Sequence, residues 1–421
     1  MPQLDTCSSL TECLDRVRTE AAKAPAQGMS WVRLTGARVE SWREKRWPTL
    51  DELDRAADGR PCAIMSFDHH AAVANSAALT ISGLSAGAKI GVNGQVCADP
   101  RTGRASGLLL EDAAYAAWKS APQPGPSERE AFVVAALEQL SGFGFTEVHD
   151  LHSQDWLGPV LGGLDRRGGV PISVRLYPAV EHLPTVHRSR AAWETDRVRL
   201  AGGKVFADGT LNSRTALMQF PYREPVDAAS TCGRAMLSPH ELEAAVRLTE
   251  SLGLHLAIHA IGDAAVRMSL DAIERAGSRG RVEIGNRHRI EHCELIDRAD
   301  VARFARLQVV CSVQPCHLLA DIDVLVSQLS HRLDRVLPLR ELIDSGCTPA
   351  GVTHEGLLWF GSDVPIVRPD PADSIQAAVR RRRLGMDGSQ AIAPEQSISE
   401  SEAWACFGGS GARHSSNGAR S

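Results

Sequence analysis

The chain has few aromatic residues, and this scarcity argues against a surface that stacks nucleic-acid bases. Aromatic residues make up 5% of the 421 residues, and the formal net charge is -5 rather than strongly positive. A protein that binds nucleic acid through its phosphates needs a basic patch, which this charge balance does not indicate. We therefore expect no nucleic-acid partner.

Long apolar runs and a secretion signal are also missing from the sequence. No apolar run approaches the ~20 residues that a membrane-spanning helix needs. The first twenty residues, MPQLDTCSSLTECLDRVRTE, lack the basic-then-apolar layout of a signal peptide. These observations predict a cytoplasmic protein without a membrane partner.

A disulfide framework is not indicated, although the chain has 10 cysteines. The cysteines are scattered along the sequence, and no CxxC pair occurs. In a chain of this size from a reducing compartment, most cysteines act as small buried hydrophobic residues. We expect that role for most of them here.

The sequence divides into regions with different patterns. Residues 1–125 are predicted to form an irregular N-terminal insertion or lid region, with Thr49 capping a helix and a hairpin or loop at 83–107. Residues 126–400 alternate between strand and helix patterns and predict a TIM-barrel domain. The Gly/Ser-rich residues 401–421 are predicted to form a disordered tail.

Seven apolar segments of the second region have the length and composition of strands, and a helical pattern follows most of them. They are residues 145–151, 172–180, 198–208, 254–261, 288–295, 308–315 and 357–365. Strand-then-helix alternation implies a parallel sheet, and this many repeats predict closure into a (β/α)₈ TIM-barrel-like fold. Because the count is one short of eight, we expect the barrel to be incomplete.

Four of these segments carry a polar residue at or near the carboxyl end: Lys204, His259, His292 and Asp363. A barrel enzyme builds its active site from side chains at this end of successive strands. Two imidazoles and an anionic oxygen suit Zn²⁺ or a similar divalent ion. The alternative interpretation is that the histidines are ordinary core residues with satisfied hydrogen bonds.

The spacing of the histidines bears on which side of each strand they occupy. Residues four apart in a strand lie on the same face. This rule predicts that His255 and His259 face the same way, and that His288 and His292 do so as well. His259 and His292 lie nearest the carboxyl ends, where reactive groups gather.

Lys204 is unusual because it lies inside an apolar strand. An ammonium group in such a place needs a partner or has a lowered pKa. One interpretation is a salt bridge to an acid such as Asp208. The other is that the neutral amine adds CO₂ and that the resulting carbamate binds the metal.

Several longer motifs occur in a fixed order between roughly positions 30 and 385. They are DHHAAVANSAAL, GFTEVHD, KVFADGTLNSRTA, HLAIHAIGDAAV, RHRIEHCEL, SVQPCH and WFGSDVP. With these motifs the sequence resembles the amidohydrolase superfamily, in the amidohydrolase-3 branch that includes N-substituted formamide deformylase-like enzymes. The resemblance implies a metal-dependent barrel hydrolase that acts on non-peptide carbon–nitrogen bonds of small amide-type substrates.

The resemblance also implies roles for individual residues. Lys204 would be the carboxylated lysine ligand, and His259 and His292 would be the ligands from strands five and six. Asp363 would bind metal and take a proton from the attacking water, then return it to the leaving amine. The implied cofactor is one or two divalent ions, with Zn²⁺ as the leading candidate. The residues implied to lie near the substrate are His70, Asn75, Arg214, Gln314 and His317.

The sequence departs from the family pattern at one motif. Family members carry an HxH pair at the end of the first strand, and no HxH occurs in this chain. The flanking β-sandwich of the family is missing as well, so we expect the chain to begin downstream of the first strand. Unpaired strand edges would then favour a homodimer.

Two other functions remain open from the sequence. A mononuclear deaminase-type hydrolase could also use His259, His292 and Asp363, although it would not need Lys204. A truncated, catalytically impaired amidohydrolase-like protein would bind a ligand or nothing. Bound metal per chain separates these alternatives.

Overall fold

The structure is a computed structural model that describes residues 2–24, 30–91, 93–225, 230–277, 287–351 and 356–408. The chain divides into two compact units, Met1–Gly125 and Pro126–Ser421. Within the described ranges, no helix combines the length and the apolar character that a membrane crossing requires.

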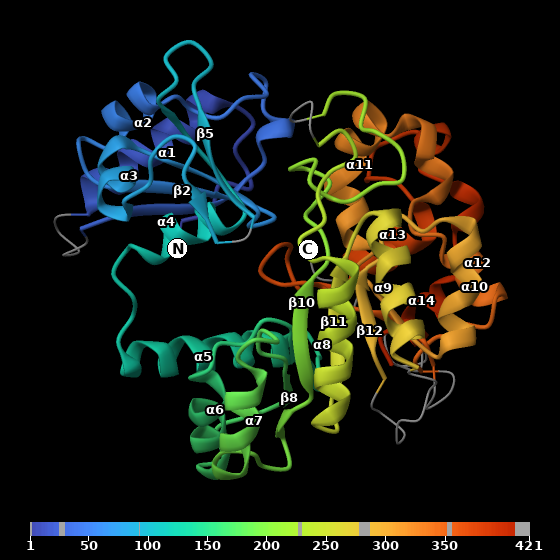
Figure 1. Ribbon diagram of the computed structural model, residues 1–421. Helices are drawn as coiled ribbons and strands as arrows, with labels where there is room; N and C mark the ends of the chain where they lie inside the picture. Colours follow the sequence, from blue (N-terminus) through green and yellow to red (C-terminus); the bar gives the residue numbers. More distant parts are fainter. Residues whose placement is uncertain are drawn as a thin grey trace, which may run out of the picture. The chain divides into compact units, whose positions relative to one another are not determined.

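Unit 1, Met1–Gly125, is a mixed α/β unit (Figure 1). Its elements are α1 (Leu10–Lys23), β1 (Val32–Ala37), η1 (Val39–Ser41), α2 (Leu50–Ala56), β2 (Cys62–Ser66), β3 (Ala71–Ala74), α3 (Ser76–Ser82), β4 (Lys89–Ile90), β5 (Gly94–Ala98), β6 (Ala105–Leu110) and α4 (Asp112–Lys119). The strands form one six-stranded sheet in the order β1-β2-β3-β6-β5-β4. Among the described strands of unit 1, β1 and β2 pair in parallel and the other pairs are antiparallel.

The expectation of an irregular region at 1–125 is therefore wrong, because this region has its own sheet and hydrophobic core. Short strands joined by turns give weak sequence patterns, and their pairing is decided by contacts distant in the sequence. Two local predictions are confirmed. Thr49 caps α2 in a complete capping box with Glu52, and strands within 83–107 form antiparallel hairpin ladders.

Unit 2, Pro126–Ser421, alternates strands with helices along the chain (Figure 1). Its strands are β7 (Glu147–Asp150), β8 (Ser173–Leu176), β9 (Val198–Leu200), β10 (Gly202–Phe206), β11 (His255–Ala260), β12 (Arg289–His292), β13 (Val310–Val313) and β14 (Leu358–Phe360). Its helices are α5 (Pro126–Gly142), α6 (Leu157–Arg166), α7 (Leu183–Ser189), η2 (Arg190–Ala192), α8 (Pro239–Ser251), α9 (Asp263–Ala276), α10 (Arg298–Leu307), α11 (Cys316–Gln328), η3 (Ser330–Arg335), α12 (Leu339–Asp344), α13 (Pro371–Arg380), η4 (Gly388–Gln390), η5 (Pro394–Gln396) and α14 (Glu400–Cys406).

The strand pairs in the described part of unit 2 are parallel and follow the chain order. One sheet has the order β7-β8-β9, and the other has the order β10-β11-β12-β13-β14. A parallel bridge between Ala179 and Lys204 joins the end of β8 to β10. Because only Ala201 separates β9 from β10, the two make up one of the seven strands that the sequence predicts. Within the described part of unit 2, no ladder joins β7 to β14, so the (β/α) arrangement is an incomplete TIM-barrel-like fold.

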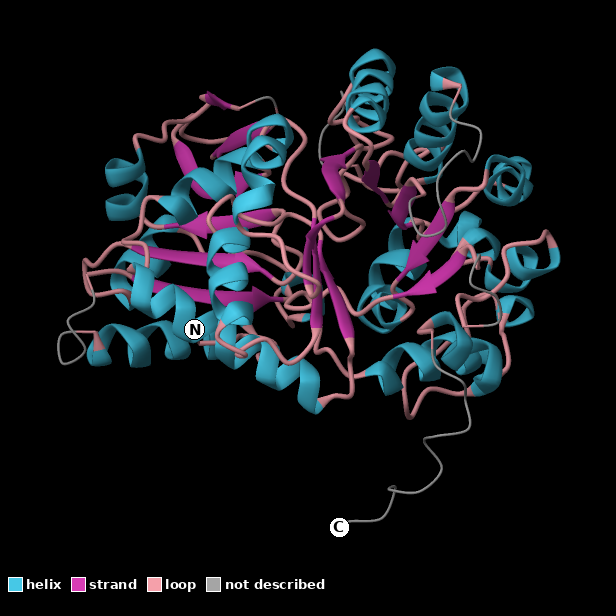
Figure 2. Cartoon of the chain, turned by 90° about the horizontal axis from the view of Figure 1, so that it is seen from below, coloured by secondary structure: helices cyan, strands magenta, loops and turns pink. Residues whose placement is uncertain are grey.

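The largest hydrophobic core of the chain lies in unit 2, between the strands and the helices outside them. Figure 1 shows α8 and α9 alongside β10 and β11, and Figure 2 shows helices outside the strands from another side. The strands of the five-stranded sheet are almost wholly buried, as expected for parallel strands that are covered on both faces. This core fixes the strand ends that carry the polar residues.

The expectation of a disordered tail at 401–421 is wrong for its first residues. Helix α14 continues to Cys406, with Ser399 as its N-cap, and Ala403 and Cys406 are buried in the core of unit 2. The Gly/Ser-rich composition begins only after this helix. Residues 409–421 lie outside the described residues.

The cysteines have the predicted environment. All ten are free thiols, and eight of them are buried. Most therefore contribute to the cores as small apolar side chains.

Candidate metal centre

The four predicted ligands lie in, or shortly after, strands of the five-stranded parallel sheet. Lys204 lies within β10, His259 is the fifth residue of β11, and His292 ends β12. Asp363 follows β14 by three residues. The register pairs Phe206 of β10 with His259, which places these groups near the carboxyl ends of their strands.

His259 and His292 lie next to each other at the ends of adjacent strands. Their ring centroids are 4.5 Å apart, with an interplanar angle of 63°. The Nε2 atom of His259 lies 3.1 Å from the carbonyl oxygen of Gly209. A carbonyl oxygen only accepts hydrogen bonds, so Nε2 carries the hydrogen and Nδ1 is the nitrogen of His259 that has a lone pair.

His288 does not share the orientation of His292, which corrects the prediction made from their spacing. His288 precedes β12, accepts a hydrogen bond from the backbone N–H of Leu256 and pairs with Glu250 of helix α8. His292 instead lies beside His259 because its φ of +74° rotates the side chain away from the regular alternation. The two-residue period holds only while the backbone stays extended.

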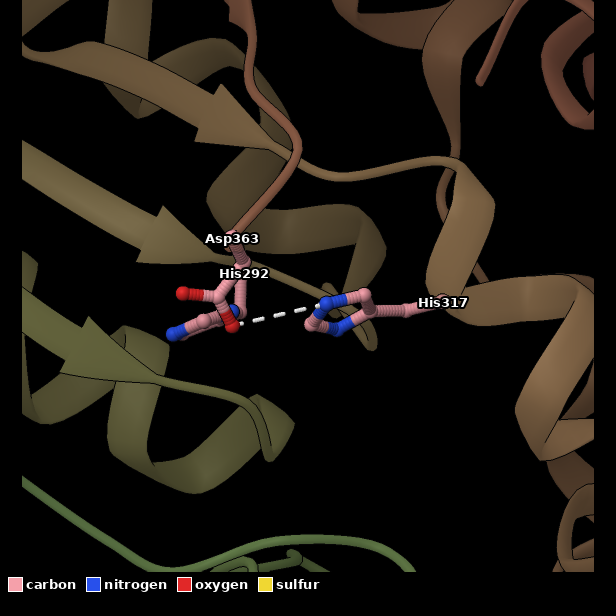
Figure 3. Close-up of side chains that lie close together, drawn as sticks. All are labelled: His292, His317 and Asp363. Atoms are coloured by element: carbon pink, nitrogen blue, oxygen red, sulfur yellow. Dashed lines mark ion pairs between the residues drawn. The ribbon is translucent and has the colours of Figure 1, made fainter. Parts of the chain in front are cut away.

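Asp363, His292 and His317 form a compact group (Figure 3). One ligand atom from each residue lies within 4.8 Å of the others. The Nε2 atom of His317 is 3.4 Å from Oδ2 of Asp363, and its ring stacks against that of His292 at 5.7 Å. Helix α11 supplies His317 as its second residue, directly after β13.

Burial and neighbouring charges act in opposite directions on this group. Burial raises the pKa of the Asp363 carboxyl, and the positive charges of His317 and Lys204 lower it without cancelling the effect. Burial lowers the pKa of His317, but Glu294, Asp363 and Asp321 more than offset this and raise it to about 9. The carboxylates around His317 thus create a place that favours positive charge.

Lys204 is buried, and its backbone is fixed on both sides. Its N–H donates to Pro178, its carbonyl accepts from Val180, and it also belongs to the ladder between β10 and β11. Burial lowers the pKa of its amine to about 8, against the attraction of Glu291 and Asp363. The side chain is therefore poised between the neutral and the charged amine.

The proposed salt bridge between Lys204 and Asp208 is not formed. The Asp208 carboxylate accepts hydrogen bonds from the backbone N–H groups of Leu217, Ile261 and Gly262, at 2.8 to 3.0 Å. These bonds hold the loop after β10 against the end of β11. Among the residues that the structure describes, Lys204 forms no ion pair.

Gln314 and Arg214 are the other predicted substrate residues of unit 2. Gln314 follows β13 and is buried, with Nε2 3.5 Å from a carboxylate oxygen of Glu291. Its Oε1 atom is buried and has no hydrogen-bond partner among the described residues. Arg214 lies in the loop after β10 with a φ of +54°, and its guanidinium donates to the carbonyl of Glu224.

His70 and Asn75 belong to unit 1. Nδ1 of His70 lies 2.7 Å from Oε2 of Glu111, and both side chains are buried. Asn75 is fully buried and caps α3, and its amide also bonds the backbone of Cys62 and Arg60. These bonds give Asn75 a structural role inside unit 1.

Four acidic or basic residues that were not predicted as site residues lie around the centre. Glu294 and Asp321 form a second compact group with His317, and the amide of Asn212 contacts Asp321. Glu291 and Arg289 pair with each other inside the sheet, and Arg289 also donates to Ser312. The motif EHCEL contains both Glu291 and Glu294. Their positions around the centre depend on the turn at His292, which the motif alone does not reveal.

The group of His292, His317 and Asp363 fits a divalent ion. Two imidazoles and one carboxylate are a donor set of Zn²⁺ and related ions. Nε2 of His317 is buried and has no hydrogen-bond partner in the part of the chain that the structure describes. A buried polar atom of this kind calls for an explanation, and a bound ion is one.

Comparison with known proteins shows related sequences over most of the chain. A 29% identity over 364 residues relates it to the "Putative amidohydrolase YtcJ" of Bacillus subtilis (strain 168), covering 82% of this chain and 64% of that protein. The "Protein LONG AFTER FAR-RED 3" of Arabidopsis thaliana is 28% identical, with 84% and 60% covered. The "N-substituted formamide deformylase" of Arthrobacter pascens is 24% identical, with 94% and 72% covered. The chain therefore spans somewhat less than two thirds of the first two relatives.

Solved structures give the same result for the fold. An uncharacterized metal-dependent hydrolase from Pyrococcus horikoshii OT3 matches with a TM-score of 0.69 and 25% identity, over 96% of this chain and 75% of that one. A second, from Pyrococcus furiosus, matches with a TM-score of 0.62, also at 25% identity, over 94% and 76%. The family model described as "Amidohydrolase family" matches residues 2–420. With its parallel strands, its polar strand ends and this match over nearly its whole length, the chain belongs to the amidohydrolase family.

Proposed function

We propose that the chain is a metal-dependent hydrolase that cleaves the carbon–nitrogen bond of a small amide-type substrate. The observation that carries the proposal is the group of His292, His317 and Asp363 at neighbouring strand ends. The family membership and the metal-dependent hydrolases among the structural relatives support it. The relative named N-substituted formamide deformylase supports an N-substituted amide as the substrate class.

His292 and Asp363 would hold a divalent ion, with Zn²⁺ as the leading candidate, and His259 and Lys204 lie on the neighbouring strands. Such an ion lowers the pKa of its bound water towards ~7 and polarises a carbonyl oxygen. Lys204 would contribute as a carbamate, because an amine with a pKa of about 8 is partly neutral and able to add CO₂. Intact-mass measurement of the native protein tests this modification as a gain of one CO₂.

Asp363 is the residue that moves the proton in this mechanism. Burial raises the pKa of its carboxyl, and a carboxylate with a raised pKa is a better proton acceptor near neutral pH. It takes the proton of the attacking water and returns it to the leaving amine. His317 lies beside this carboxylate, with its Nε2 atom 3.4 Å from Oδ2 of Asp363.

Gln314 is suited to bind the substrate amide. Its Oε1 atom is a buried acceptor without a partner among the described residues, and an amide N–H would satisfy it. Its Nε2 atom points towards Glu291, which fixes the direction of the side chain.

The test measures the hydrolysis of a panel of N-substituted formamides and simple amides by the purified chain. We expect activity that a chelator removes and that added Zn²⁺ restores. Asp363→Asn should reduce kcat by about 10²-fold or more, as expected when a general acid–base group is lost. His182→Gln is the control, since this exposed histidine pairs with Asp155 away from the centre.

The outcomes separate the alternatives that the sequence leaves open. The chain could bind metal, hydrolyse none of these amides and deaminate a ring amine. That result would favour a deaminase function over the amide proposal. A chain that binds no metal would support the catalytically impaired protein.

A further inference from the structure

His317 contacts a carboxylate through each of its two ring nitrogens. Nε2 lies 3.4 Å from Oδ2 of Asp363, and Nδ1 lies 3.3 Å from Oε1 of Glu294. The ring also stacks on His292, with an interplanar angle of 22°. In Figure 3 the imidazole of His317 extends from α11 towards Asp363. The position of this ring is thus determined from three sides.

Nε2 of His317 is the unsatisfied atom of this arrangement. It is buried, and it has no hydrogen-bond partner in the ranges that the structure describes. The residue is 7% exposed, so bulk water does not solvate the ring. The separation of 3.4 Å from Asp363 is longer than a good charge-assisted hydrogen bond, which is about 2.7–2.9 Å. The atom therefore points into the group of His292 and Asp363 without completing a bond there.

Glu294 determines which nitrogen of His317 can bind a cation. A carboxylate accepts hydrogen bonds, so the contact with Glu294 favours a hydrogen on Nδ1 and a lone pair on Nε2. Histidines that bind metals commonly donate their other ring N–H to a carboxylate in this way. Glu294 is itself fixed, because its backbone carbonyl accepts the N–H of Leu337 at 2.8 Å.

The charge around the ring also favours a cation. The carboxylates of Glu294 and Asp321, which are buried, and of Asp363, which is partly buried, surround one imidazole. Taking carboxylates out of water is costly unless positive charge or hydrogen bonds compensate. A divalent ion on Nε2 would supply that charge, and it would displace the proton that otherwise occupies the same place.

We infer that His317 is a metal ligand of this chain, together with His292 and Asp363, and that Glu294 is the positioning residue that orients its imidazole. The inference rests on the metal dependence in the proposed function but not on the amide substrate. It gives His317 a different role from the substrate contact that the sequence resemblance implies.

The experiment measures metal binding by the full chain without reference to activity. Zn²⁺ affinity is determined by competition with a chromophoric chelator, and the Co²⁺-loaded protein is examined by absorption spectroscopy. We expect His317→Gln to weaken Zn²⁺ binding by at least about 10-fold and to change the Co²⁺ spectrum. Glu294→Gln should weaken binding by about 10–100-fold, as is typical when the partner of a ligating histidine is lost. His182→Gln removes the histidine of an exposed histidine–carboxylate pair and should leave both measurements unchanged.

A second variant keeps the test decisive if His317→Gln folds poorly. His317→Cys supplies a thiolate at the same position, and a thiolate is a good ligand of Zn²⁺ and Co²⁺. A new sulfur-to-cobalt charge-transfer band in this variant would support direct ligation, because a misfolded or merely structural site does not produce it.

The failure of this inference can be told apart from the failure of the proposed function. Normal Zn²⁺ affinity in folded His317→Gln, with binding lost in His292→Gln, would overturn the role of His317 and leave the hydrolase proposal standing. A wild-type chain that binds neither Zn²⁺ nor Co²⁺ would overturn both.

Discussion

Replacing Lys204 by methionine should stabilise the chain although it removes a residue of the proposed centre. The side chain of Lys204 is buried, and burial lowers the pKa of its amine from 10.5 to about 8. With about 1.4 kcal/mol for each pH unit between the two values, the charged amine costs roughly 3 kcal/mol at neutral pH. Methionine has a similar length and no charge, but it leaves Glu291 and Asp363 without the attraction of Lys204. We therefore expect a net gain of about 1–2 kcal/mol at pH 7.

The pH dependence gives the sharper test of this reasoning. The pKa of Lys204 is lower in the folded than in the unfolded chain, so the unfolded chain binds more protons between pH 8 and 10.5. The stability of the wild type should therefore rise with pH across this window, and Lys204→Met should lack that rise. Below pH 8 the difference between the two proteins should be constant.

The assay is urea denaturation at pH 7, 8, 9 and 10, with chelator and without bicarbonate so that Lys204 is a plain amine. Lys119→Met is the control, since Lys119 is exposed on α4 and its replacement should change stability by less than about 0.5 kcal/mol. A Lys204→Met protein that is less stable than the wild type at pH 7, or a difference that does not depend on pH, would refute the argument.

Three other predictions concern the stability of the two units. His255 is buried, and burial together with the nearby Arg289 lowers its pKa to about 3, so the protein should lose stability as the pH falls from 6.5 to 3. The unfolding temperature of His255→Gln should therefore fall less steeply with decreasing pH than that of the wild type, and equal slopes would contradict this. Gly162→Ala in α6 should destabilise by about 1–3 kcal/mol, because its Cβ would meet the Trp193 carbonyl oxygen at 2.1 Å. Gly163→Ala in the same helix meets only the end of a flexible side chain and should be neutral or stabilising by denaturant titration. Thr49→Ala should destabilise unit 1 by about 1 kcal/mol through the loss of the capping box, and Thr49→Ser should restore most of this in the same titration.

The strands of unit 2 could be predicted from the sequence because of how parallel strands are buried. Strands covered on both faces appear as short continuous apolar runs, and each run here is separated from the next by a helix. The seven predicted segments all contain strands, from Glu147–Asp150 to Leu358–Phe360. The polar residues at their ends could be identified for the same reason, since Lys204 and His259 interrupt runs that are otherwise apolar.

The surroundings of the centre could not be predicted in the same way. Helix α11, which supplies His317 and Asp321, is buried on several sides and has no simple amphipathic pattern, so it did not stand out as a helix. The pairing of Glu294 with His317 joins residues 23 positions apart in the sequence. Contacts of this kind depend on how β12 and α11 pack, which neither segment reveals alone. The sheet of unit 1 was missed because its strands are short and their partners are decided by distant contacts.

The backbone at the strand ends shows that this part of the fold is shaped for more than stability. His292, Cys293 and Asp363 have φ values of +74°, +47° and +57°, in the region that glycine adopts most easily. Such conformations cost of the order of 1 kcal/mol or more for each residue, and they persist only where the surrounding structure enforces them.

The consequence of this strain can be followed in β12. Regular alternation would direct His292 to the side of His288, which faces helix α8. The left-handed turn at His292 instead places its ring 4.5 Å from that of His259 and within the group that contains Asp363. A chain under selection for stability alone would favour glycine at these turns. His292 and Asp363 place an imidazole and a carboxylate at two of them instead, which is consistent with the proposal that their ligand atoms, rather than their contribution to folding, account for their presence.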